Sequence, residues 1–78
     1  MEKGKLFYDN DQVTQKQLVL EALGNPKCAH LTIYRQRPGE ENIIRVAITQ
    51  KDMTHDYYKL EWNQYEQKFF NIRKANIL

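Results

Sequence analysis

The sequence predicts an α+β fold, in which a single short helix packs on one face of a mostly antiparallel sheet of four or five strands. Only one segment, residues 14–23, combines helix-capping residues with a wide apolar arc. Most of the remaining chain alternates apolar and polar residues, as strands do, and turn-forming residues separate the alternating segments. The predicted order of elements is β-α-β-β-β-β, and residues 1–78 are expected to form one domain.

The N-terminal part is predicted to hold a short strand, residues 5–8, followed by the helix. Thr14 and Gln17 have the spacing of a capping box, in which the threonine hydroxyl accepts a hydrogen bond from the amide of Gln17 and the glutamine side chain reaches back. Gly24 suits the left-handed conformation that ends many helices. The apolar residues of the helix cover more than half of its circumference and require a sheet as packing partner: Leu18, Val19, Leu20, Ala22 and Leu23.

A β-hairpin is predicted for the middle of the chain. Residues 31–35 and 43–49 are rich in β-branched residues and alternate apolar and polar side chains. Pro38 and Gly39 lie between them and suit the two central positions of a type II turn, because proline fixes φ and glycine tolerates a positive φ. The two segments are therefore expected to pair as antiparallel strands across this turn.

The segment at residues 57–73 fits two structures. Apolar and charged residues alternate on both sides of a polar turn near residues 64–67, as a second hairpin requires. A helix would also place one set of residues on a single face: Tyr58, Trp62, Tyr65, Phe69 and Ile72. We favour the hairpin, because the aromatic and β-branched content of the segment is typical of strands.

The alternative fold is a winged helix-turn-helix. Its first helix would comprise residues 14–23, its second and third helices residues 29–37 and 40–51, and its wing residues 57–73. Residues 43–49 argue against it, because this segment carries three isoleucines, a valine and a threonine, which are poor helix formers.

Composition and charge narrow the classes of function. With 41% hydrophobic and 28% charged residues, the chain has the balance of a folded domain. Its net charge of +2 is weakly basic, whereas proteins that coat DNA usually carry a larger excess. The single cysteine, Cys28, allows no internal disulfide and indicates the cytoplasm. Apolar runs are too short to cross a bilayer, so no membrane partner is expected.

Few residues could perform catalysis or bind a metal. Cys28, His30, His55 and Asp56 are the only candidates for a metal site, or for a nucleophile with its base and orienting acid. Their spacing matches no zinc motif, and the sequence contains no Gly-rich loop or known catalytic motif. We therefore expect no catalytic residue, no metal, no cofactor and no small-molecule substrate.

Alternation along the predicted strands leaves one face of the sheet without cover, because one short helix packs against one face only. This second face is expected to expose a mixture of aromatic and basic side chains, which are the candidate binding residues: Tyr34, Arg45, Tyr57, Lys59, Phe69 and Arg73. Phe70 and Ile72 are expected on the face that packs against the helix.

A face of this composition suits two kinds of partner. Tyrosine, phenylalanine and arginine are enriched at protein interfaces, including those of homodimers. Aromatic rings also stack on unpaired bases, while basic side chains contact phosphates. The weak net charge, together with Glu61 on the same face, favours a small non-enzymatic module that binds protein or self-associates. The alternative is nucleic acid, bound as a single strand on the sheet face or as duplex DNA by a winged helix.

Overall fold

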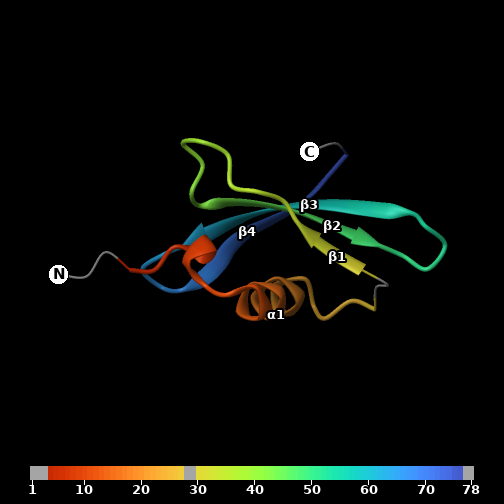
Figure 1. Cartoon of the computed structure of the whole chain (residues 1–78), viewed down its shortest axis with the longest axis horizontal. Helices are drawn as coiled ribbons and strands as arrows, with labels where there is room; N and C mark the ends of the chain where they lie inside the picture. Colours follow the sequence, from red (N-terminus) through yellow and green to blue (C-terminus); the bar gives the residue numbers. More distant parts are fainter. Residues whose placement is uncertain (1–3, 28–29, 77–78) are drawn as a thin grey trace.

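Four antiparallel strands occupy the sheet in the same order as in the chain, and α1 lies along one face of it (Figure 1). The computed structural model describes residues 4–27 and 30–76 and has the predicted α+β fold. Neither of the helices in these residues is long and apolar enough to span a membrane. The elements are η1 (a 3-10 helix, Phe7–Asp9), α1 (Gln12–Ala22), β1 (His30–Ile33), β2 (Ile43–Thr49), β3 (His55–Asn63) and β4 (Lys68–Ala75).

The first predicted hairpin is confirmed, since β1 and β2 pair antiparallel. The turn within their connection has type II geometry: the amide of Glu40 donates to the carbonyl of Arg37 at 3.0 Å, and Gly39 has a φ of +78°. The winged helix-turn-helix is excluded, because β2 lies within residues 40–51, which that fold needs as a helix.

The helix begins earlier than predicted and ends as predicted. Asp11 is the N-cap, whereas Thr14 lies inside the first turn and donates its hydroxyl hydrogen to Asp11 Oδ1 at 2.5 Å. The predicted capping box is therefore wrong, because Asp11 offers a favourable N-cap three residues earlier. At the other end, Gly24 has a φ of +82°, and the amide of Asn25 donates to the carbonyl of Leu20 at 2.7 Å. This is a Schellman motif, which satisfies the last carbonyls of the helix.

The strand predicted at residues 5–8 is wrong, because η1 forms there instead. Phe7 is fully buried, and its ring centroid lies 5.7 Å from that of Trp62 and 5.4 Å from that of Phe69. The indole Nε1 of Trp62 donates to the carbonyl of Lys5 at 2.9 Å. The segment therefore packs against core side chains rather than against a strand edge, and the sheet has four strands.

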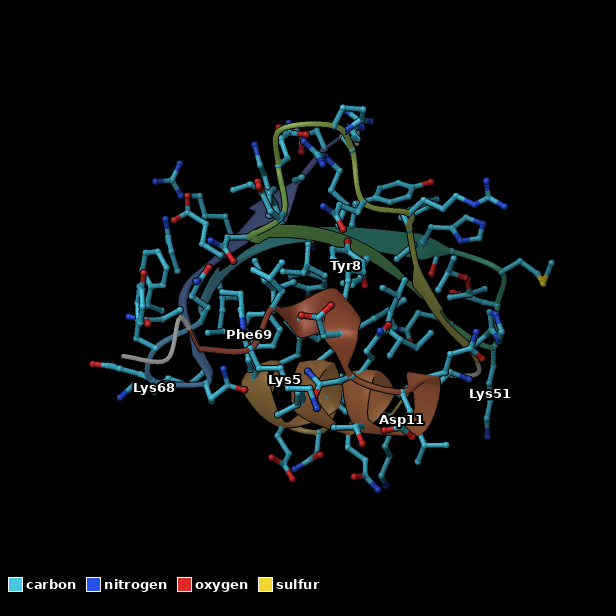
Figure 2. All side chains as sticks on the ribbon, turned by 60° about the vertical axis from the view of Figure 1, so that its left-hand side comes forward. Lys5, Tyr8, Asp11, Lys51, Lys68 and Phe69 are labelled. Atoms are coloured by element: carbon cyan, nitrogen blue, oxygen red, sulfur yellow. The ribbon has the colours of Figure 1, made fainter. Side chains whose placement is uncertain are left out.

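The core lies between the sheet and the layer formed by η1 and α1. Figure 2 shows Tyr8 and Phe69 on this side of the sheet. The strands contribute alternate residues to the core, so the remaining residues lie on the opposite face, which we call the open face. The buried core residues are Phe7, Val19, Leu31, Ile44, Val46, Ile48, Leu60 and Trp62.

The second predicted hairpin is confirmed as β3 and β4, but a β-bulge interrupts its register. Trp62 pairs with Phe69 and Glu61 pairs with Asn71, so Phe70 is an extra residue in β4. Phe69 consequently packs in the core, whereas Phe70 is 63% exposed. The predicted faces of these two phenylalanines are therefore wrong, because the prediction assumed unbroken alternation.

Candidate functional site

Five of the six predicted binding residues lie on the open face. Lys59 is the Cα partner of both Arg45 and Arg73, so these three residues form a row across β2, β3 and β4. Tyr34 continues the row beyond β2, since its amide donates to the carbonyl of Arg45 at 2.9 Å. Tyr57 lies two residues before Lys59 on β3 and therefore on the same face.

The row of Arg45, Lys59 and Arg73, which we call the cation row, places like charges directly opposite one another. Neighbouring strands lie about 4.8 Å apart, so the row extends for roughly 10 Å across the sheet. Like charges at directly opposed positions destabilise a sheet. An anion bound along the row would offset this repulsion.

A groove lies beside the cation row, beneath residues 34–42. This connection between β1 and β2 stands off the sheet on the side opposite α1 (Figure 1). The groove has a volume of about 550 Å³. Its lining combines two tyrosines with three arginines: Tyr34, Arg35, Gln36, Arg37, Pro38, Arg45 and Tyr57.

The start of this connection is held by a hydrogen bond from the core side. The hydroxyl of Tyr8 donates to the carbonyl of Tyr34 at 3.2 Å. Burial raises the pKa of Tyr8, so the hydroxyl stays protonated and remains a donor through neutral pH. The position of Tyr34 in the lining of the groove therefore depends on η1 as well as on the sheet.

Arg45 is not exposed as predicted, because Glu40 covers it. Its Nη2 lies 2.9 Å from both Oε1 and Oε2 of Glu40, and the arginine is only 7% exposed. The hydrogen bond from Arg45 is the main reason why the pKa of Glu40 lies below its ordinary value, with smaller contributions from the charges of Arg37 and Lys59. At one end of the cation row, the carboxylate of Glu40 thus already occupies the position beside Arg45 that an anionic ligand would take.

Tyr57 has small neighbours across the sheet and an aromatic neighbour along its own strand. Its Cα partners are Ala47 on β2 and Ala75 on β4. The ring of His55 lies 6.2 Å away at an interplanar angle of 23°, and the Nδ1 of His55 lies 3.0 Å from the hydroxyl of Thr49. Tyr57 is therefore supported on one side by His55, and its neighbours across the sheet are small.

Phe69 is the predicted binding residue that the structure places elsewhere. Its ring lies 5.0 Å from that of Trp62 in the core, and Phe70 occupies the open face instead. Arg35 and Arg37 also line the groove, although they were not among the predicted binding residues. Their signal was visible in the sequence, because two arginines that flank one glutamine directly before Pro-Gly form a basic turn.

The three described candidates for catalysis or metal binding, His30, His55 and Asp56, do not form one cluster. His30 and His55 both pair with Thr49 and lie on the open face, whereas Asp56 lies on the core side and pairs with Lys74 at 3.4 Å. Residues 4–27 and 30–76 contain no group of three or more His, Cys, Asp or Glu side chains that could hold a metal ion. Cys28 lies outside the residues that the structure describes.

Comparisons of the chain with protein-family models, with curated proteins and with solved structures give no match. The interpretation of the open face therefore depends on its own geometry and charge.

Proposed function

We propose that this protein is a non-enzymatic binding module that holds single-stranded nucleic acid on its open face. The observation that supports this proposal is the cation row beside Tyr34 and Tyr57. A single strand supplies both phosphates for the cations and unpaired bases for the rings. The lone cysteine makes the cytoplasm the compartment that we propose.

The charge of the groove and the cation row favours a polyanion more strongly than the net charge of the whole chain does. Of the cations in the groove and the cation row, only Arg45 forms a salt bridge with a residue that the structure describes. Glu61 follows Lys59 by two residues on β3, on the same face, and its carboxylate accepts a hydrogen bond from the Asn71 side chain at 2.7 Å. The net charge of +2 therefore understates the local positive charge of the groove and the cation row, even though Glu40 and Glu61 lie beside them.

The test is to measure binding of a fluorescent oligothymidylate by anisotropy across a range of salt concentrations. Because bound cations release counterions from the phosphates, affinity should fall steeply between about 50 and 200 mM salt. Arg73→Gln should weaken binding and reduce the slope of log affinity against log salt concentration by about one, the value expected for the loss of one phosphate contact. Lys74→Gln is the matched control, since Lys74 is the next residue of β4 and lies on the other face.

Two results would contradict the proposal: binding that does not depend on salt, or equal effects of Arg73→Gln and Lys74→Gln. Circular dichroism of both variants should match the wild type, because both side chains are exposed and surface changes usually shift stability by no more than about 0.5 kcal/mol.

The second candidate is association with protein, including a second copy of this chain. It is supported by β4, an edge strand of eight residues on which Phe70 is 63% and Ile72 is 42% exposed. A solution mass that rises with protein concentration, with mild salt dependence and no oligonucleotide binding, would favour this candidate.

A further inference from the structure

A shallow depression lies at the opposite end of the open face from the groove, around Phe70. It has a volume of about 270 Å³ and is lined in part by Ile43, Asn63, Tyr65 and Phe70. Tyr65 is 74% exposed and Phe70 is 63% exposed, so both rings are accessible to a ligand. Isolated exposed aromatic residues are common, but here two of them border one concavity.

The β-bulge is what brings Phe70 to this face. Phe69 lies opposite Trp62 on the core side, and Asn71 lies opposite Glu61 on the open face. Phe70 is inserted between these two pairs, and it lines the depression together with open-face residues of β2 and β3. Bulges re-aim side chains in this way and are frequent beside functional sites.

The depression and the groove lie on either side of the cation row. On β3, the open-face residues Tyr57, Lys59 and Glu61 follow at intervals of two residues, or about 7 Å each. Phe70 lies next to Glu61, so it is about 13 Å from Tyr57 along the strand direction. An aromatic site, a row of cations and a second aromatic site therefore follow one another along the face.

We infer that the depression beside Phe70 is a second base-binding subsite, which takes a base of the same single strand whose other base lies in the groove. This inference rests on the proposed function. The phosphates between the two bases cross the cation row, which runs perpendicular to the line that joins the two subsites. Glu61 makes the depression unfavourable for a phosphate, whereas its carboxylate is an acceptor for an N–H group on the edge of a base, such as the N3–H of thymine.

The experiment compares two oligothymidylates, a dinucleotide and an oligomer of about ten nucleotides, binding to the wild type, Phe70→Ala and Tyr57→Ala. The longer strand can occupy both subsites, but the dinucleotide can occupy only one. Phe70→Ala should weaken binding of the longer strand at least fivefold, the lower end of the effect that base stacking gives. It should leave dinucleotide binding unchanged, whereas Tyr57→Ala should weaken binding of both.

Ile72→Ala is the matched control, since Ile72 is a partly exposed apolar residue of the same strand but lies on the core side, opposite Leu60. The subsite is refuted if Phe70→Ala and Ile72→Ala have the same effect on the longer strand. If Tyr57→Ala alone weakens binding, the subsite is wrong and the proposed function stands. If neither oligonucleotide binds, both the subsite and the proposed function are wrong.

Discussion

Arg45 lies on the open face and is nevertheless almost completely buried, because the side chain of Glu40 packs against it. The carboxylate contacts the guanidinium through both oxygens at 2.9 Å, while the glutamate side chain itself remains 35% exposed. A phosphate would make the same kind of charge-assisted contact with Arg45. Glu40 therefore competes with an anionic ligand for this arginine.

Glu40→Gln should increase affinity for a single strand by roughly two- to fivefold, because it removes a partly exposed charge that competes for Arg45. The measurement is the same anisotropy titration at low salt. Glu41→Gln is the control, since it changes the net charge equally at the next, exposed residue. Equal gains in both variants would mean that total charge, rather than access to Arg45, sets the affinity.

The carboxyl group of Glu40 should also titrate below its ordinary pKa of 4.5, because the hydrogen bond from Arg45 favours the ionised form. A folded-state pKa below the unfolded value means that the stabilising contact is present above pH 4.5 and is lost as the pH falls through the folded-state pKa. Carbon NMR of the side-chain carboxyl group gives the midpoint. Arg45→Gln should move it back towards 4.5. An unchanged midpoint in that variant would contradict this assignment.

At the residue scale, strand alternation was sufficient to predict the face of Tyr34, Arg45, Tyr57 and Lys59. Arg45, Tyr57 and Lys59 lie in regularly paired strands, and Tyr34 directly follows β1 and donates to the carbonyl of Arg45, so a period of two applies. The burial of Arg45 was not predictable in the same way, because its partner belongs to a connection whose path depends on tertiary contacts. Only the turn within that connection carries a local signal, from proline and glycine.

At the scale of elements, the β-bulge is the feature that most changes the face. Local propensity predicted β3, the polar turn and β4 correctly, because aromatic and β-branched residues favour strands. Two adjacent phenylalanines give no local signal for which of them faces the core. The choice depends on packing, since Phe69 contacts both Phe7 and Trp62, and Phe7 comes from a segment distant in sequence.

Deletion of Phe70 should be tolerated, because it removes the extra residue and leaves both flanking pairs, Trp62 with Phe69 and Glu61 with Asn71, in register. Thermal unfolding should stay cooperative, with a melting temperature close to that of the wild type. Deletion of Lys59 is the control: it also removes one exposed residue, but it shifts the register of a central strand. Loss of the fold in both deletions would show that the bulge itself is required.

At the scale of the whole molecule, the segment before α1 completes the core. Phe7 has no exposed surface and contacts the rings of Tyr8, Trp62 and Phe69. The carbonyl of Lys5 accepts hydrogen bonds from side chains of both β3 and the following turn. The sequence predicted a strand here because Leu6, Phe7 and Tyr8 form a short apolar run. Whether such a run packs into the core instead depends on how much of the core α1 leaves uncovered.

Phe7→Ala should cost about 3–5 kcal/mol of stability, as truncation of a buried phenylalanine does. A domain of this length has a total stability of about 4–12 kcal/mol, so the variant should be close to unfolding. Urea denaturation followed by the fluorescence of Trp62 measures the loss. Val13→Ala is the control, since Val13 is 64% exposed and should change stability by less than about 0.5 kcal/mol. Similar losses in the two variants would contradict the role of Phe7.

The contact between Lys5 and Trp62 joins residues 57 positions apart, and this separation affects how the protein is made. Each hairpin of the sheet joins strands that are consecutive in the chain, so it can form soon after its second strand has been synthesised. The residues of η1 and α1 leave the ribosome before their packing partners on β3 and β4 do. Phe7 therefore lacks its ring partners Trp62 and Phe69 until β3 and β4 have been synthesised, and this is the interval in which aggregation competes with folding.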